Sequence, residues 1–300
     1  MKICVLFIGK VQDAGFNACA LRGADHIANW SDVVVEIVGD VPFEADAMRT
    51  ALTGAASRND AVIFIGGQGN AVVPDVARAH PKVTFAVVQG DVSGPNLASY
   101  EVLQEQSAFL AGCLAAQLTQ TGIVGHLSGH RVTPGLKGRA AYVAGVRYVD
   151  PEIRVLTGFC GTQDDNEVAK SWALAEIEKG ADLIFTMLNG AREGVIDACR
   201  HTGTRQIGNV LDWVETNPDD FVASAIAQID LAVRQAATDL ITQHLPSNVE
   251  AIGLAEGAVA LSLGEQVSTR ITEDITKFGE LITAQKIEIL TRYQGLEFEL

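Results

Sequence analysis

Short apolar runs of strand length alternate with helix-length segments along this chain, and no other feature restricts the possible folds as strongly. Within residues 1–90, the pattern predicts strands at 3–9, 33–38, 61–67 and 83–88 and helices at 15–30, 43–57 and 70–79. Strands that alternate with helices form a parallel sheet, with the helices packed on its faces. The chain is therefore predicted to belong to the α/β class.

A second series of the same kind follows the first. Its predicted strands are 122–127, 153–158, 182–187 and 206–210, and its predicted helices are 135–148, 164–179 and 191–202. A chain of 300 residues is too long for one ordinary core. Two α/β series of similar size predict two lobes. The helix between them, 108–118, has no charged residue and must be buried on most sides.

Segments 95–102 and 221–224 are predicted to cross between the lobes, and 249–263 is predicted to be either two short strands or a third crossing. They divide the chain into an N-terminal lobe, 1–103 plus 224–257, and a C-terminal lobe, 104–223 plus 258–300, with a ligand cleft between them. A hinge of three strands would let such a cleft close on a small molecule. The remaining pattern predicts helices at 226–240 and 271–282 and a final strand at 287–290.

The turn after the first predicted strand, Asp13-Ala14-Gly15-Phe16-Asn17, carries a carboxylate, an aromatic ring and an amide. In open α/β sheets, small ligands bind at the carboxyl ends of the strands. Phe16 is suited to cover the face of a heterocycle whose polar edge Asp13 and Asn17 would hydrogen-bond. The alternative is a helix N-terminus in which Asp13 is the cap and Phe16 packs inward. These five residues alone leave both interpretations open.

Polar loops also follow the third and fourth predicted strands. They read Gly66-Gly67-Gln68-Gly69-Asn70 and Gln89-Gly90-Asp91, and in a parallel sheet they share an edge with Asp13 and Phe16. Glycine in such a loop lets a ligand approach the backbone closely. The first loop lacks the Lys-Ser/Thr pair of a phosphate loop. Ordinary turn chemistry is the alternative explanation of its glycines.

The charge of the chain excludes several classes of partner. A formal net charge of −15 without a basic stripe argues against nucleic acid and against an anionic membrane surface. No apolar run approaches the roughly 18 residues that a membrane span requires. Met1-Lys2 leads directly into the first strand, without the pattern of a signal peptide. The expectation is therefore either a cytoplasmic protein or a chain whose targeting segment is missing.

Patterns typical of enzymes and metal sites are missing from the sequence. No pair of histidines carries the His-Glu-x-x-His pattern of a zinc site, and Leu127-Ser128-Gly129 lacks the leading Gly of a nucleophile elbow. The five cysteines have no metal-type spacing and are predicted to be reduced core thiols. We therefore expect no catalytic residue, no metal site and no cofactor.

Several spaced patterns together resemble one known family. They are Tyr100 with Gln106-Ser107-Ala108-Phe109-Leu110-Ala111-Gly112, Thr121-Gly122-x-Val124-Gly125, Ala140-x-Tyr142-x2-Gly145, Gly180-Ala181-Asp182 and Ile207-Gly208. With the opening Asp13-x-Gly15-Phe16-Asn17, the chain resembles the basic membrane protein family of solute-binding proteins over essentially its whole length. Many members are purine nucleoside receptors of ABC transporters. The resemblance implies a type I periplasmic-binding-protein fold, with two Rossmann-like α/β/α lobes joined by a three-strand hinge.

The resemblance also implies roles for individual residues. Phe16 would stack on the base, and Asp13 and Asn17 would hydrogen-bond to it. Where the family usually has a ribose-binding Asp after the fourth strand, this chain has Gln89. A second family Asp, after Ile207-Gly208, is replaced by Val210. The expected ligand-binding residues are Asp13, Phe16, Asn17, Gly66, Gln68, Gln89, Asp91, Phe159, Asn189, Asp212 and Trp213.

The two missing carboxylates affect the choice of ligand. Each would have contributed charge-assisted hydrogen bonds of roughly 1.5–3 kcal/mol to a ribose. An ordinary nucleoside would therefore bind weakly unless Asp91, Asp212 or Trp213 takes their place. A free purine base or another small heterocycle is the alternative ligand.

The expected function is that of a monomeric solute-binding protein, not an enzyme, that closes on a purine nucleoside or base and works with an ABC transporter permease. By the resemblance it would be periplasmic or at the cell surface. A cytoplasmic ligand-sensing regulator with the same fold is the first alternative, and it fits a chain without a signal. A nucleoside-processing enzyme, such as a hydrolase or transferase, is the second.

Overall fold

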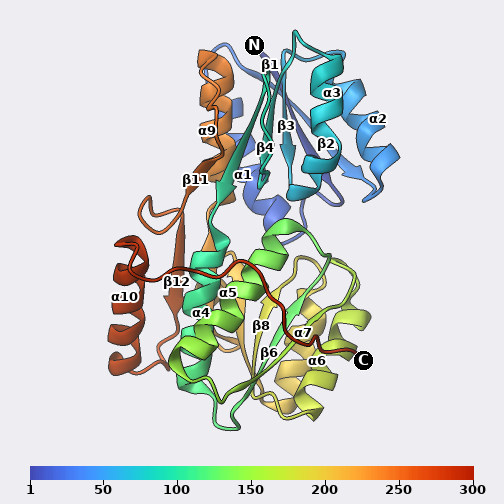
Figure 1. The fold of residues 1–300 in the computed structure, drawn as a ribbon. Helices are drawn as coiled ribbons and strands as arrows, with labels where there is room; N and C mark the ends of the chain where they lie inside the picture. The colour runs from blue at the N-terminus through green and yellow to red at the C-terminus, as the bar shows by residue number, and fades with distance from the viewer. The chain divides into compact units, whose positions relative to one another are not determined.

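The computed structural model describes residues 1–300, which form two compact units (Figure 1). The first unit comprises Met1–Val102 and Gln228–Ile252, and the second comprises Leu103–Ala227 and Gly253–Leu300. The chain thus passes from one unit to the other three times. The sequence analysis placed the corresponding boundaries at 103, 224 and 257.

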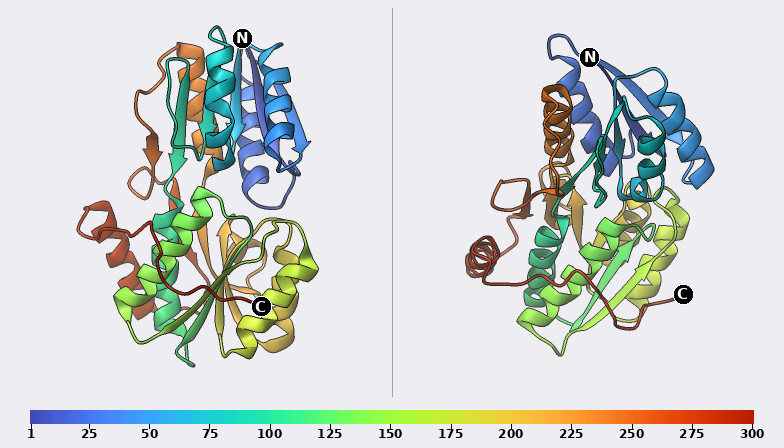
Figure 2. Two further views of the ribbon diagram at one scale, coloured as in Figure 1. Left: turned by 45° about the vertical axis from the view of Figure 1, so that its right-hand side comes forward. Right: turned by 45° about the horizontal axis from the view of Figure 1, so that its top comes forward.

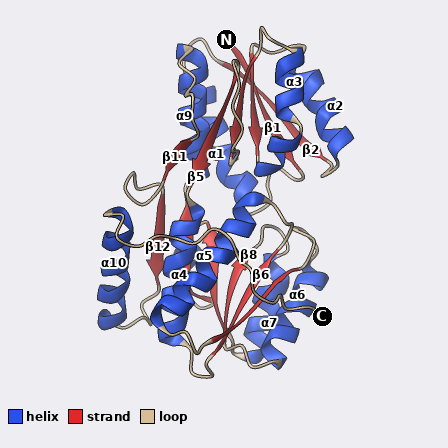
Figure 3. Ribbon diagram, in the orientation of Figure 1, coloured by secondary structure: helices blue, strands red, loops and turns tan.

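The first unit is a six-stranded sheet between two layers of helices (Figure 3). Its strands are β1 (Lys2–Ile8), β2 (Val34–Val41), β3 (Ala61–Ile65), β4 (Thr84–Val88), β5 (Leu97–Val102) and β11 (Glu250–Ile252). Its helices are α1 (Phe16–Ala28), α2 (Ala45–Ala56), α3 (Val73–Ala79) and α9 (Ile229–Thr242), with a 3-10 helix at Gly67–Ala71. The strand order is β11-β5-β4-β3-β1-β2, and every neighbouring pair is parallel. Because helices cover both faces, the central strands are almost continuously apolar.

The second unit repeats this architecture. Its strands are β6 (Ile123–Ser128), β7 (Arg154–Phe159), β8 (Leu183–Met187), β9 (Arg205–Val210), β10 (Phe221–Ala227) and β12 (Val259–Leu263). Its helices are α4 (Gln104–Leu118), α5 (Thr133–Val149), α6 (Asn166–Glu178), α7 (Arg192–Thr202), α8 (Trp213–Thr216) and α10 (Thr269–Thr283). The strand order is β12-β10-β9-β8-β6-β7, and only β12 runs antiparallel. The predicted α/β class and the two parallel sheets are confirmed.

Helices α4 and α5 pack unusually closely, through glycines. A Cβ atom at Gly112 would collide with the backbone of Tyr142, and one at Gly145 would collide with the backbone of Phe109. The Tyr142 ring stacks on Phe185 of the sheet, with ring centroids 5.1 Å apart. Part of the sequence pattern that carries the family resemblance is therefore a helix–helix core contact.

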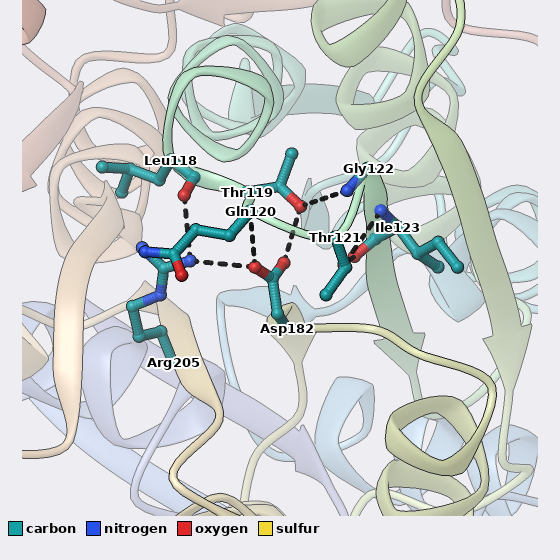
Figure 4. Close-up of polar contacts among 8 residues, drawn as sticks. All are labelled: Leu118, Thr119, Gln120, Thr121, Gly122, Ile123, Asp182 and Arg205. Carbon is teal, nitrogen blue, oxygen red and sulfur yellow. Dashed lines mark hydrogen bonds and ion pairs between the residues drawn. The ribbon is translucent and has the colours of Figure 1, made fainter.

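Asp182 accounts for another part of that pattern (Figure 4). It lies at the amino end of β8, and its carboxylate accepts hydrogen bonds from Thr119 Oγ1 and from the Gln120 backbone N–H, both at 2.6 Å. Arg205 donates to the same carboxylate at 3.2 Å and to the Leu118 carbonyl at 2.9 Å. Asp182 thus ties the turn after α4 to the sheet, at the edge opposite the carboxyl ends of the parallel strands.

Two local predictions were wrong. Residues 221–224 do not form a crossing but belong to β10, where they pair with β9. Residues 287–290 do not form a strand but lie in an extended segment, 285–300, that we call the strap. Figure 2 shows the strap, in dark red, running from the end of α10 across α5. Ile287 and Ile289 pack inward on the core while Glu288 is exposed, so the period-two pattern reflects an extended chain lying on helices.

Candidate functional site

Each sheet has a topological switch point, where successive strands of the chain are added on opposite sides of the first strand. β1 lies between β2 and β3 in the first sheet, and β6 lies between β7 and β8 in the second. Loops that leave the carboxyl ends of such strands diverge to opposite faces of the sheet and open a crevice for ligands. Most of the residues expected to bind ligand lie in or beside loops at these edges, so the carboxyl edge of each sheet is a candidate site in its own unit.

The backbone at these edges is strained at corresponding positions of the two units. Gln89 follows β4 with φ 67°, and Val210 ends β9 with φ 67°. Positive φ is unusual for any residue with a side chain, and it is a genuine outlier for β-branched valine. Such strain persists only where the surroundings impose it, and it clusters at ligand sites. The strained residues therefore lie at the same carboxyl edges as the residues expected to bind ligand.

In the first unit, Asp13 organises the start of α1. Its buried carboxylate accepts hydrogen bonds from the backbone N–H groups of Gly15, Asn17 and Ala18 at 2.9–3.0 Å. The Asn17 amide donates to the carbonyls of Ile8 and Lys10, which holds the end of β1 against the helix. Asp13 therefore pairs with backbone N–H groups at the start of α1, as the capping interpretation expects, although the N-cap residue itself is Gly15. A contact of Asp13 or Asn17 with a ligand stays a prediction.

Phe16 is the first residue of α1, and its side chain is half-buried. It thus places an aromatic surface directly beside the carboxyl end of β1. Its predicted stacking on a base is not tested by this geometry.

The loops after β3 and β4 lie beside this turn on the same sheet edge. The Gln68 side chain donates to the Ile65 carbonyl at 3.2 Å, and Gly66 has φ 113°, which favours glycine. The Gln89 amide is engaged by the backbone of Val102, whereas Asp91 is exposed. Among the polar side chains predicted in these two loops, Asp91 is the most open to solvent.

In the second unit, Phe159 is the last residue of β7, and only 8% of it is exposed. The guanidinium groups of Arg131 and Arg139 lie over its ring, 4.7 and 4.9 Å from the centroid. Asn189 follows β8, and its backbone N–H donates to the Gln163 side chain at 3.2 Å. Both predicted residues therefore lie at the carboxyl edge of the second sheet.

Arg192 is a polar residue at this edge that the sequence analysis missed. Only 1% of it is exposed, although it carries a charge. Its guanidinium donates to Thr186 Oγ1 at 2.8 Å, binds Asn209 Oδ1, and lies over the Trp213 ring at 4.6 Å from the centroid. Asp212 caps the short helix α8 that begins with Trp213. The sequence signal that could have identified Arg192 was a basic residue shortly after a predicted strand end in a strongly acidic chain.

Burial shifts the pKa of several titratable side chains in the two units. His126 is fully buried, and desolvation lowers its pKa to about 3, so it is neutral at ordinary pH. Burial raises the pKa of the Cys4 and Cys199 thiols to about 12, which disfavours the nucleophilic thiolate. No group of three or more His, Cys, Asp or Glu side chains is placed to hold a metal ion. No helix is both long and apolar enough to cross a bilayer.

Comparison with known proteins identifies similar sequences and folds. A family model described as "ABC transporter substrate-binding protein PnrA-like" matches residues 1–292. Basic membrane protein D of Borreliella burgdorferi is 23% identical over 293 residues, which cover 92% of this chain and 82% of that protein.

Two solved structures are similar to this chain along nearly its whole length. A solute-binding protein of an ABC transporter system from Aeropyrum pernix has a TM-score of 0.85 at 20% identity and covers 98% of this chain and 94% of its own. A transcriptional activator of the comK gene from Bacillus halodurans has a TM-score of 0.78 at 19% identity, with 95% and 99% covered. The predicted type I periplasmic-binding-protein fold is confirmed.

Proposed function

We propose that this chain, which belongs to the PnrA-like family of ABC transporter substrate-binding proteins, binds a purine nucleoside or a purine base and delivers it to an ABC importer permease. The observation that carries the proposal is the edge at β1. There, a half-buried aromatic ring, Phe16, is held at the start of α1 by the hydrogen bonds of Asp13 and Asn17. A flat π-surface beside placed polar groups suits a planar heterocycle with several polar edge atoms.

In this proposal, each unit offers ligand-binding groups at the carboxyl edge of its own sheet. Phe16 stacks on the base, and Asn189, Asp212, Trp213 and Phe159 contribute from the second unit. Aromatic surface and convergent polar groups are what ligand pockets in general provide. Arg192 adds a cation that is already desolvated and oriented by Thr186 and Asn209.

The hydrogen bonds of Gln89 affect which residue of this loop could bind a ribose. Both polar atoms of its side chain are paired with Val102, so a contact with ribose would compete with these hydrogen bonds. We therefore assign the ribose hydroxyls, in the nucleoside version of the proposal, to exposed Asp91. In the free-base version this loop makes no sugar contact.

The first experiment is identification, by mass spectrometry after denaturation, of the small molecule that copurifies with the protein. Ligand-free protein is then titrated by calorimetry with adenosine, guanosine, inosine, adenine and hypoxanthine. A ligand at 100 times its Kd should stabilise the fold by about 2.7 kcal/mol, which is measurable as a rise in Tm. No copurifying heterocycle, no heat and no rise in Tm with any of the five would overturn the proposal.

A Phe16→Ala variant tests the placement of the site. It is expected to lose at least about tenfold in affinity for the preferred compound, because the stacking surface is removed. Trp30→Ala is the matched control, since Trp30 is a half-buried aromatic residue that follows the other end of α1. Unchanged affinity in Phe16→Ala would show that the ligand binds elsewhere.

We further propose that the protein is not an enzyme. The matched family is one of substrate-binding proteins, and the neutral, buried His126 is poorly placed to act as a base. Incubation with a bound nucleoside should return it unchanged. Release of free base or of ribose would instead support the nucleoside-processing alternative.

A ligand-sensing regulator is the second candidate function, favoured by the similarity of fold to the comK activator. Transport requires a location outside the cytoplasmic membrane, whereas regulation requires the cytoplasm. Fractionation of the source cells, with an antibody against the protein, distinguishes the two. Recovery from the cytoplasmic fraction alone would exclude the transport role.

A further inference from the structure

The carboxylate of Glu297 binds two arginines at once. Arg131 Nη1 donates to Glu297 Oε1 at 3.1 Å, Arg131 Nη2 pairs with Oε2, and Arg139 Nη1 pairs with Oε1. Hydrogen bonds from Arg131, and then from Arg139, lower the pKa of Glu297 to about 2. One side chain of the strap therefore pairs with two cations contributed by other parts of the second unit.

The same two arginines meet at Phe159. Their guanidinium groups lie 4.7 and 4.9 Å from the centroid of its ring, at the carboxyl end of β7. Arg131 comes from the loop after β6, whereas Arg139 comes from α5 and is only 5% exposed. Without the Glu297 carboxylate, the positive charges of Arg131 and Arg139 would lie over the Phe159 ring with nothing between them to reduce their repulsion. The buried charge of Arg139 would also lose this counterion. The carboxylate thus reduces the repulsion between two cations that pack on the same ring.

The strap is held in place at the end that carries Glu297. The Phe298 N–H donates to the Thr157 carbonyl at 2.8 Å, which adds a hydrogen bond to β7, the last strand of its sheet. The Phe298 ring packs edge-on against Trp172, with centroids 6.1 Å apart. Earlier in the strap, a groove of about 690 Å³ lies between it and α5. The end of the strap that carries Glu297 is therefore tied directly to the edge strand of the sheet.

We propose that Glu297 is a positioning residue for ligand binding: it holds Arg131 and Arg139 against Phe159 and thereby orients this ring at the carboxyl edge of the second sheet. Glu297 acts through the two arginines and does not itself touch the ligand. The inference rests on the proposed function, because it takes Phe159 to be a ligand-binding residue. The competing explanation is that the strap only protects the edge of β7.

The test uses the whole chain with Glu297→Ala, and with Glu297→Gln in case the alanine variant does not fold. Glu288→Ala is the matched control, because Glu288 is an exposed carboxylate on the same strap. Affinity is measured by calorimetry with the best of the five purine compounds named above. We expect Glu297→Ala to weaken binding by at least about tenfold, and Glu288→Ala to leave it unchanged.

Acetate separates positioning from edge protection. In Glu297→Ala, excess acetate can take the place of the missing carboxylate between the two guanidinium groups. It should restore part of the affinity, whereas chloride at the same ionic strength should not. In Glu297→Ala, hydrogen exchange at the Phe298 amide should be faster than in the unaltered protein, with or without acetate. Free acetate is not linked to the strap and therefore cannot hold it against β7.

Two results would overturn the inference: full affinity in Glu297→Ala, or a loss of affinity that acetate does not restore. The second result would indicate a purely structural strap. A failure of the proposed function is distinguishable, because in that case the unaltered protein binds none of the purine compounds.

Discussion

The side chain of Gln89 pairs with the backbone of Val102 through both of its polar atoms. Its Nε2 donates to the Val102 carbonyl at 3.1 Å, and its Oε1 accepts from the Val102 N–H at 2.6 Å. Val102 is the last residue of β5 and of the first segment of the first unit. These hydrogen bonds help offset the strain of a positive φ at Gln89. Gln89 therefore anchors the first crossing.

Gln89→Ala should be strongly destabilising. It leaves the N–H and the carbonyl of buried Val102 without these partners, and each such loss costs about 1–3 kcal/mol. We expect the free energy of unfolding, measured with urea, to fall by about 2–6 kcal/mol. Gln68→Ala is the control, since half-buried Gln68 bonds a single carbonyl. Equal losses in the two variants would contradict this account.

Glu176 should make stability depend on pH. Its carboxyl is fully buried against Gly125, and neither oxygen has a hydrogen-bond partner. Burial raises its pKa well above the usual range, so the folded protein keeps the proton. The unfolded chain loses that proton above a pKa of 4.5. Stability contributed at Glu176 therefore falls as pH rises above that value, by about 1.4 kcal/mol per pH unit, until the folded carboxyl ionises.

A Glu176→Gln variant carries no such proton. It should exceed the unaltered protein in stability at pH 7, and the difference should shrink towards zero near pH 4, where Glu176 is protonated in both states. Urea denaturation at a series of pH values measures this. Glu178→Gln, an exposed position on the same helix, should show no such trend. A difference that does not vary with pH would refute the burial of a neutral carboxyl.

Gly112 and Gly279 are helical glycines with opposite surroundings. Alanine at Gly112 brings a methyl group against the backbone of Tyr142 and Val146 in the α4–α5 contact, and we expect a loss of about 1–3 kcal/mol or more. At Gly279 of α10, the nearest atom is Leu110 Cδ1 at 4.0 Å. There, alanine should be neutral or stabilising by up to about 1 kcal/mol. Thermal denaturation of both variants checks the contrast, and equal shifts in Tm would show that α4 and α5 can separate.

Asp13 has a confirmed structural role and a proposed ligand role, which two variants separate. Asp13→Ala removes the acceptor for three backbone N–H groups and should cost about 1–2 kcal/mol of stability. Asp13→Asn keeps one oxygen and should cost less. If the carboxylate also contacts the ligand, Asp13→Asn should weaken binding, measured by calorimetry, by more than its small loss of stability explains. Unaltered affinity in Asp13→Asn would limit Asp13 to capping.

The alternating strands and helices were predictable because the hydrophobic periods that indicate them are local. The predicted helix at 15–30 and the predicted strand at 61–67 correspond to α1 and β3. The prediction failed at 287–290, where the same period-two pattern arises from an extended segment packed on helices instead of on a neighbouring strand. Local periodicity does not reveal what a segment will lie against.

The sequence by itself determined the α/β class, the two parallel sheets and the loops at their carboxyl edges, because these follow from short-range patterning and chain connectivity. Only the tertiary structure decided which polar side chains in those loops are already engaged. Gln89 is paired with Val102, and Arg192 is buried beside Trp213. Glu297 reaches Arg131 across 166 residues of sequence. Such pairings depend on the packing of elements far apart in the chain, and no local pattern encodes them.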